Sequence, residues 1–355
     1  MALKQQLISP EFLIHPGVTL QEYLEEFNMT QVELAKRTSF TEKHVSTVIN
    51  GSKKISAEFA LKLEYALGVP AYFWQNLQRN YDLEEAMLEE THNIKKDEIN
   101  ISKDIKKIYE DISNTKLSNN EKEQVLQLRR GLEIADLTKI NELNHANYRY
   151  QFQENMSEYA MYTWRFLCEK DVRNQKLEEF DIEILKSNLQ RIKNLMHVYP
   201  EEVENELRKV LNKCGIGFVV KKHGDKAPIN GLTTKTRDNK IMIALTIRNK
   251  FVDIFWFTLF HELAHVIYGD YKHRNPSKED NDRYEARANE FAANFLIDNE
   301  KYQEFIESAN FTNENIEYFA AINGVIPSIV YGRLMKDGHM NWNKSYNRLR
   351  YDWLK

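Results

Sequence analysis

The chain has 355 residues, a length that allows two or three domains with a sizeable core. Hydrophobic residues make up 42% and charged residues 29%, a balance that excludes an intrinsically disordered chain. The net charge of -4 excludes a general attraction to nucleic acid, so any DNA binding must come from a local patch. The few cysteines, and the absence of a signal peptide or long apolar run, predict a cytoplasmic protein without a membrane partner.

Residues 1–80 have the pattern of a bundle of short helices. Thr30 and Thr41 each precede a run with apolar residues at helical spacing, which is the position of an N-cap, and Asn50-Gly51 ends the second run. Two helices joined by a tight turn with these caps predict a helix-turn-helix motif. The predicted helices are Val18–Phe27, with Phe27 turned inward, then Gln31–Arg37, Glu42–Ile49 and a fourth that starts at Ser56 and includes Leu67.

The runs TQVELAKRT, VSTVINGSKKIS and ALKLEYALGVPAYFW resemble XRE-type helix-turn-helix domains, in particular the HigA-like antidote branch. The resemblance implies a homodimer that places Glu42–Ile49 in the major groove of an operator. An alternative is that the bundle only dimerises or docks a protein. DNA binding is favoured because Val45 and Ile49 supply the inward face while the outward face stays short and polar. The expected base-facing residues are Glu42, Lys43, His44 and Thr47, and the expected phosphate contacts are Gln31, Ser52, Lys53 and Lys54.

Residues 81–212 are charged, poor in glycine and proline, and mostly helical in pattern. The stretch Met156–Glu169 carries aromatic residues at helical spacing, which is more typical of a core than of a ligand site. We interpret this region as a helical linker or bundle that either dimerises or senses a signal.

Residues 213–355 begin with two β-rich runs, Ile216–Lys221 and Lys240–Leu245, and continue into an apolar segment that contains His261 and His265. These histidines are four residues apart, so on a helix they project from one face and can bind one Zn²⁺. Glu262 can take a proton from a water molecule at the metal. The alternative is an ordinary core helix with chance histidines, but burying these groups among Phe, Trp and Leu is costly without a metal.

Two histidines leave a catalytic zinc ion under-coordinated, so a third ligand must come from elsewhere. In the next helical stretch, Glu285 lies along the apolar stripe that Ala288 belongs to, and it therefore points inward. Asn289, one turn further on, is placed to hydrogen-bond a ligating histidine. Glu285 is the expected third ligand, and Glu290, which lies off the stripe, is the alternative.

The segments FWFTLFHELAH and EARANEFAANFLI resemble the ImmA/IrrE-type metallopeptidase family, and the resemblance covers roughly the last third of the chain. It implies that His261, His265 and Glu285 are zinc ligands and that Glu262 is the general base. Many relatives carry a second acid where this chain has Arg287. If that acid were the ligand, the zinc site here would be incomplete.

The expected fold class is mainly α with a small sheet (α+β). It would comprise a helix-turn-helix domain (residues 1–80), a helical linker or bundle (81–212) and a zincin-like peptidase domain (213–355). The expected function is a DNA-binding transcriptional regulator carrying a zinc metalloendopeptidase that cleaves a specific regulator protein. The alternative is a non-catalytic HigA-like antitoxin or repressor whose C-terminal domain senses a signal or binds a toxin. The presence of Glu262 favours hydrolysis, since a structural zinc site needs no base.

Overall fold

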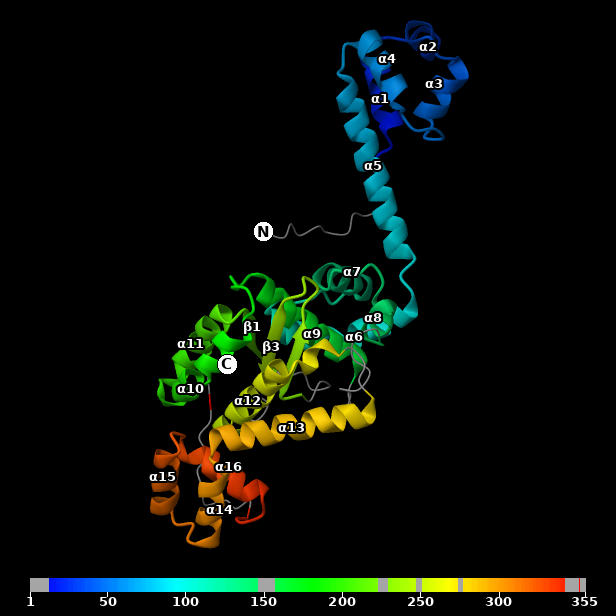
Figure 1. The fold of residues 1–355 in the computed structure, drawn as a ribbon. Coiled ribbons are helices and arrows are strands. Elements are labelled where there is room, and N and C mark those ends of the chain that lie inside the picture. Colours follow the sequence, from blue (N-terminus) through cyan, green and yellow to red (C-terminus); the bar gives the residue numbers. More distant parts are fainter. Residues whose placement is uncertain are drawn as a thin grey trace. The chain divides into compact units, whose positions relative to one another are not determined.

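The computed structural model describes residues 13–145, 157–222, 229–246, 251–273, 277–341 and 351. The chain divides into two compact units, one formed by residues 1–99 and 119–126, and the other by residues 100–118 and 127–355. Among the described residues the structure is mainly helical, with one three-stranded sheet (Figure 1). The expected fold class, mainly α with a small sheet, is confirmed. No described helix is long and apolar enough to cross a membrane.

The first unit begins with a bundle whose local structure follows its capping residues. The hydroxyl oxygens of Thr30, Thr41 and Ser56 each accept a hydrogen bond from a backbone N–H three residues later, at 3.1 Å. Leu20, Leu34, Val45, Phe59, Leu63 and Trp74 are fully buried and form the core of the bundle. Its helices are α1 (Pro16–Glu26), α2 (Gln31–Thr38), α3 (Glu42–Ile49), α4 (Ala57–Leu67) and α5 (Ala71–His92).

One detail of the predicted bundle is wrong. Helix α1 ends at Glu26, so Phe27 is its C-cap residue, and 49% of Phe27 is exposed to solvent. The prediction placed Phe27 on the inward face of a helix that continues through it. Because the helix ends one residue earlier, the side chain does not follow the helical pattern.

The helices that follow lead to the sheet of the second unit. In α9, Tyr162, Trp164 and Phe166 are buried, which confirms that the aromatic residues of this stretch belong to a core. Both α9 and α11 pack against strand β1 (Ile216–Lys221). The helices of this region are α6 (Lys96–Ser113), α7 (Glu121–Gly131), α8 (Ile140–His145), α9 (Glu158–Arg173), α10 (Ile182–Asn194) and α11 (Pro200–Lys213).

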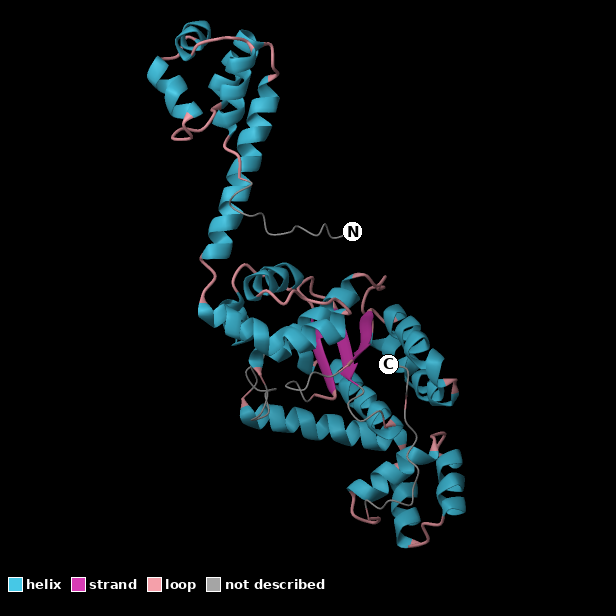
Figure 2. Cartoon of the chain, turned by 180° about the vertical axis from the view of Figure 1, so that it is seen from behind, coloured by secondary structure: helices cyan, strands magenta, loops and turns pink. Residues whose placement is uncertain are grey.

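The sheet has the order β1-β3-β2 and includes a strand that the sequence did not predict. Strand β3 (Ile241–Thr246) runs parallel to β1, and β2 (Gly231–Lys235) pairs with β3 in the antiparallel direction. Strand β3 is buried along its length and β1 at every residue but its last, and Figure 2 shows helices around all three strands. Because β2 is a short run with a glycine and two threonines, it lacks the apolar alternation that predicts a strand.

Helix α12 (Val252–Tyr268) packs against β2 and β3 and is buried on most of its surface. Gly269 ends it in the left-handed conformation, with φ of 77°. Helix α13 (Lys278–Leu296) makes the most extensive contact with α12, and α16 (Pro327–Lys336) also packs on it. The remaining C-terminal helices are α14 (Asn299–Glu307) and α15 (Asn313–Ile322).

Candidate metal centre and candidate nucleic-acid interface

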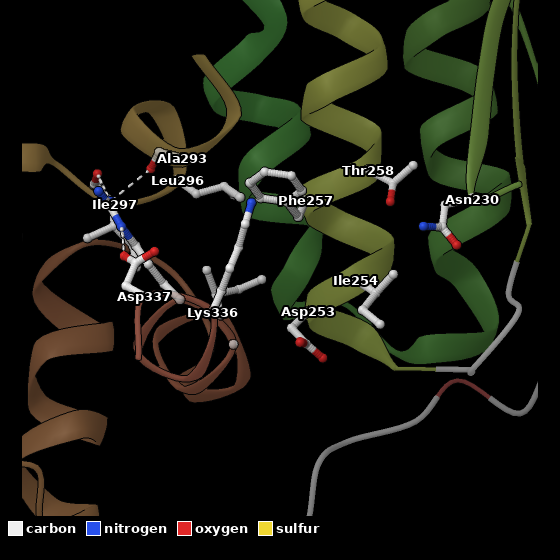
Figure 3. Close-up of a pocket in the computed structure, with 13 residues that line it drawn as sticks. Asn230, Asp253, Ile254, Phe257, Thr258, Ala293, Leu296, Ile297, Lys336 and Asp337 are labelled. Atoms are coloured by element: carbon white, nitrogen blue, oxygen red, sulfur yellow. Dashed lines mark hydrogen bonds and ion pairs between the residues drawn. The ribbon is translucent and has the colours of Figure 1, made fainter. Parts of the chain in front are cut away.

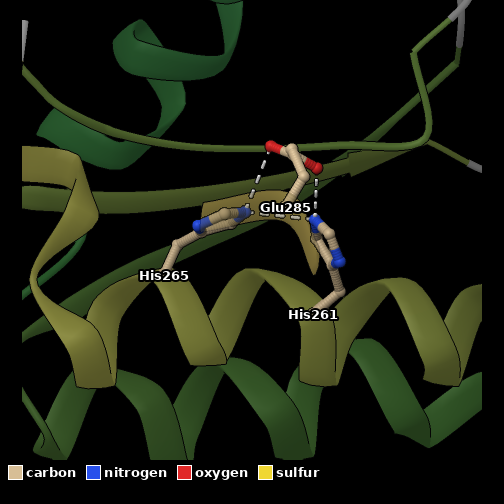
Figure 4. A group of neighbouring side chains, drawn as sticks. All are labelled: His261, His265 and Glu285. Atoms are coloured by element: carbon tan, nitrogen blue, oxygen red, sulfur yellow. Dashed lines mark hydrogen bonds and ion pairs between the residues drawn. The ribbon is translucent and has the colours of Figure 1, made fainter. Parts of the chain in front are cut away.

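Helices α12 and α13 bring His261, His265 and Glu285 together. The two imidazoles project from one face of α12 and meet the Glu285 carboxylate (Figure 4). The Nε2 atoms of His261 and His265 are 3.1 Å apart, and they lie 3.2 and 3.5 Å from the two carboxylate oxygens of Glu285. The Glu285 side chain is 43% exposed, whereas those of the histidines are 14% and 12% exposed. The group is therefore accessible from the side on which Glu285 lies.

The opposite nitrogens of both rings have fixed oxygen partners. Nδ1 of His261 lies 3.0 Å from Oδ1 of Asn289, and Nδ1 of His265 lies 3.0 Å from Oδ2 of Asp270. Each neutral imidazole therefore carries its proton on Nδ1, which leaves the Nε2 lone pair facing the other ring and the Glu285 carboxylate. Three electron-pair donors that converge in this way repel one another unless a cation lies between them.

The spacing of these donors suits a zinc ion. In a tetrahedral site with bonds of about 2.0–2.1 Å, neighbouring ligand atoms are about 3.3–3.4 Å apart. The two Nε2 atoms are 3.1 Å apart, close to that value, and each faces a different oxygen of Glu285, at 3.2 and 3.5 Å. With one oxygen taken from Glu285, the three ligand atoms lie within 4.8 Å of one another. Two histidines and one carboxylate also leave a fourth position open, which is the arrangement of catalytic rather than structural zinc sites. The residues present therefore fit the metal that the sequence predicts.

Asp270 is a functional candidate that the sequence analysis missed. It follows Gly269, the residue that ends α12, and its chain turns back through η4 (Asp270–Lys272) so that the carboxylate reaches His265. Its second oxygen accepts a hydrogen bond from the Arg287 guanidinium at 2.5 Å. That guanidinium also stacks on the Tyr268 ring, 4.0 Å from its centroid. An acid directly after the glycine that closes a metal-binding helix is the sequence signal that could have revealed it.

Arg287 stands where many relatives carry a second acid, and it donates to the carboxylate of Asp270. The carboxylate that converges with His261 and His265 is that of Glu285. Glu290, the alternative ligand, is exposed on α13 and does not belong to the cluster.

Glu262 lies beside this cluster in a closely packed position. It is 6% exposed, and its Oε2 accepts a hydrogen bond of 2.6 Å from the hydroxyl of Thr233 on β2. A Cβ atom on Gly231 would lie only 2.5 Å from Oε1, so only glycine leaves room for the carboxylate there. Burial raises the pKa of Glu262, while the neighbouring histidines and the Thr233 hydrogen bond oppose that rise. A carboxylate with a raised pKa is suited to accept a proton near neutral pH.

The first unit presents α3 as its candidate nucleic-acid interface. Of the residues expected to contact DNA, Glu42, Lys43, Ser52, Lys53 and Lys54 are exposed. Three of the expected residues, Thr47, Gln31 and Lys54, interact within the protein. The Thr47 hydroxyl donates to the backbone carbonyl of His44 at 2.9 Å, the Gln31 amide lies 3.4 Å from Oε1 of Gln21, and Lys54 forms an ion pair of 3.0 Å with Asp82.

His44 is half-buried rather than turned to solvent. Its ring packs against Phe40 and Phe59, with centroid distances of 4.4 and 4.8 Å, and Nδ1 lies 3.0 Å from Nζ of Lys53. Burial, together with the positive charge of Lys53, lowers the pKa of this imidazole. His44 therefore fixes the position of Lys53 beside α3. On α2, Arg37 forms an ion pair of 2.7 Å with Glu33.

Comparison with known families finds a match over each of the two regions that carry a candidate site. Residues 20–74 match the helix-turn-helix family model, and residues 253–335 match the model of the IrrE N-terminal-like domain. The chain belongs to the helix-turn-helix family through its N-terminal region, and residues 253–335 are similar to the IrrE N-terminal-like domain. Both resemblances seen in the sequence are therefore confirmed. The match to the IrrE N-terminal-like model includes every residue of the candidate metal centre on α12 and α13, and the helix-turn-helix match includes every expected DNA-contact residue.

The curated relatives align with about a fifth of this chain. One is an uncharacterized HTH-type transcriptional regulator, YddM, of Escherichia coli K12, which is 32% identical over 71 residues, or 20% of this chain and 76% of that protein. Another is virulence-associated protein I of Dichelobacter nodosus, 34% identical over 74 residues, or 21% of this chain and 68% of that protein.

Two solved structures align over a similar length. An addiction module antidote protein of the HigA family from Coxiella burnetii is 36% identical, with a TM-score of 0.21, and the alignment covers 21% of this chain and 84% of that one. The Pseudomonas aeruginosa antitoxin HigA with the higBA promoter is 32% identical, with a TM-score of 0.22, over 23% of this chain and 96% of that one.

Proposed function

We propose that this chain is a DNA-binding transcriptional regulator whose C-terminal domain is a zinc-dependent endopeptidase that cleaves a specific regulator protein. The observation that supports the proposal most strongly is the convergence of two Nε2 atoms and one carboxylate beside a buried glutamate. A structural zinc site would need the three ligands but not Glu262. In this proposal residues 1–80, 81–212 and 213–355 are the DNA-binding, linking and peptidase regions.

A zinc ion bound by His261, His265 and Glu285 would polarise the carbonyl group of a peptide bond and make a water molecule acidic. The Glu262 carboxylate is the base that accepts the proton of the attacking water and later delivers it to the leaving amine. Thr233 donates to one oxygen of Glu262 and so orients the other. Asn289 and Asp270 hold the imidazole rings with Nε2 toward the metal.

Strand β2 is placed to hold an extended substrate. Among the described residues, β2 has a strand neighbour on one side only. The backbone N–H of Thr246 donates to the carbonyl of Asn230, and the backbone N–H of Thr236 donates to the carbonyl of Lys240. In an antiparallel pair every second residue bonds to the same neighbouring strand, so the even-numbered residues of this stretch face β3. The backbone groups of Gly231, Thr233 and Lys235 therefore point to the opposite edge, next to Glu262. A peptide that added to this edge would lie along the candidate metal centre.

Operator binding is the proposed function of the first unit. The family match and the HTH-type regulators among the relatives support it, as do the exposed Lys43 and Lys53 beside α3. A homodimer would place two copies of α3 in successive turns of the major groove. Because the chain as a whole is negatively charged, its attraction to DNA must come from the basic residues near α3. We therefore expect the affinity for DNA to fall steeply as salt is added.

The test uses the full chain with Glu262→Gln, and with Glu290→Gln as a matched control on an exposed position of α13. Zinc content, binding to the DNA upstream of its own gene, and cleavage of peptides from a lysate of the host cells are measured together. We expect Glu262→Gln to keep zinc and DNA binding and to lose cleavage, while Glu290→Gln keeps all three. Cleavage that survives in Glu262→Gln would contradict the role of Glu262 as the base. Cleavage that is absent from the unmodified protein would favour the alternative of a non-catalytic antitoxin or repressor that binds a toxin or a signal.

A further inference from the structure

A pocket of about 330 Å³ opens between α12, α13 and α16 (Figure 3). Thr258, which precedes His261 by three residues on α12, forms part of its wall, and so does Asn230, the residue before β2. A Cβ atom on Gly231 would meet Thr258 at 2.7 Å and Glu262 at 2.5 Å. The wall of the pocket and the surroundings of the proposed base are therefore continuous.

The pocket is lined mainly by apolar side chains. Its apolar residues are Ile254, Phe257, Leu296, Ile297 and Ile329. The volume lies at the lower end of the range of about 300–1,000 Å³ for pockets that hold whole small ligands. It suits one large side chain of a longer molecule better than a complete cofactor.

The charged groups around the pocket are engaged by the protein itself. Arg333 donates hydrogen bonds to the carbonyls of Ala293 and Ile297 at 3.2 and 3.1 Å and stacks on Tyr302. Lys336 lies over the Phe257 ring, 4.7 Å from its centroid. Asp253 is in the first turn of α12, where the helix dipole stabilises a carboxylate. Arg333 and Lys336 are therefore engaged by groups of the protein itself.

We propose that this pocket receives a large apolar side chain, such as that of leucine, methionine or phenylalanine, from the residue beside the cleaved peptide bond. The inference rests on the proposed peptidase function and names the substrate class that its site accepts. A peptide lying along the outer edge of β2 passes Gly231 and Glu262, so a neighbouring side chain reaches the wall formed by Asn230 and Thr258. Burial of that side chain fixes the scissile bond over the metal centre and selects the sequence that is cut.

The test is a map of cleavage sites in the same host-cell peptides, read by mass spectrometry after incubation with the zinc-loaded full chain. We expect one fixed side of the cut to carry a large apolar residue, with at least about a 10-fold preference over alanine. Ile254→Trp fills the pocket and should move the preference toward alanine and glycine, while Ile254→Ala widens it and should admit tryptophan. Ile184→Trp, the same change at an exposed position of α10, should leave the preference unaltered.

The possible outcomes separate the two proposals. If the unmodified protein cuts peptides without a residue preference, or if both Ile254 variants keep the original preference, the pocket is not the specificity site although the peptidase function stands. If Ile254→Trp changes the rate equally for all sequences, the pocket holds a small effector instead and the inference is overturned. If the unmodified protein cuts nothing, the peptidase function fails, and the inference fails with it.

Discussion

Replacing Asp270 by asparagine tests how the proposed zinc ligands are held. The side chain of Asp270 is 7% exposed and joins two partners, Nδ1 of His265 at 3.0 Å and the Arg287 guanidinium at 2.5 Å. Asparagine keeps the shape but has only one oxygen. If that oxygen accepts from His265, the new amide group points two N–H donors at Arg287; if the amide turns round, His265 loses its acceptor.

The expected loss of zinc affinity follows from the role of a carboxylate that hydrogen-bonds a ligating histidine. Loss of a carboxylate that orients a ligating imidazole lowers metal affinity by about 10–100-fold, which corresponds to about 1.4–2.7 kcal/mol. We expect the upper half of that range for Asp270→Asn, since the substitution removes a charge from a buried position and also leaves Arg287 without its ion pair.

Zinc affinity is measured on the full chain by competition with a chromophoric chelator at fixed pH and salt concentration. Asp280→Asn is the matched control, because Asp280 forms an ion pair of 2.8 Å with Arg283 on the exposed side of α13, away from the histidines. We expect the control to bind zinc like the unmodified protein. An Asp270→Asn protein that is folded and binds zinc with unchanged affinity would refute the role assigned to Asp270.

Three further predictions concern separate parts of the molecule. Gly231→Ala places a Cβ atom 2.5 Å from Oε1 of Glu262, so we expect peptide cleavage to fall at least about 100-fold while zinc content stays the same; undiminished cleavage would contradict the packing argument. Lys43→Ala should weaken DNA binding and reduce the slope of log affinity against log salt by about 1, measured by fluorescence anisotropy; an unchanged slope would remove Lys43 from the interface. Lys193→Met leaves the two carbonyl groups at the end of α13 without their donor, so we expect a loss of about 1–3 kcal/mol in the free energy of unfolding by urea, and a loss below that range would count against this contact.

Features set by residues close in the sequence could be predicted well. The caps Thr30, Thr41 and Ser56 act on N–H groups three residues away, so local pattern alone places the starts of α2, α3 and α4. The two histidines share a face of α12 because helical geometry determines it. Glu285 was found in the same way, since a carboxylate on the buried stripe of the next helix must face its neighbour.

Features that depend on tertiary contact could not be predicted. Thr233 reaches Glu262 only because β2 packs against α12, and nothing in the short run Gly231–Lys235 indicates that contact. Asp270 reaches His265 through the turn of η4, and Arg287 completes the group from a different helix. His44 is another example, because its sequence position at the start of α3 suggests an outward side chain, whereas packing against Phe40 and Phe59 turns it toward the core.

The metal content of the full chain tests the central claim most directly. Protein purified in buffer with a trace of zinc and then desalted is analysed by inductively coupled plasma mass spectrometry, alongside His261→Ala with His265→Ala and, as a control, His273→Ala. We expect close to one zinc ion per chain in the unmodified protein and in the control, and only background zinc in the double variant. Equal zinc in the double variant, or none in the unmodified protein, would contradict a metal centre formed by these two histidines and Glu285.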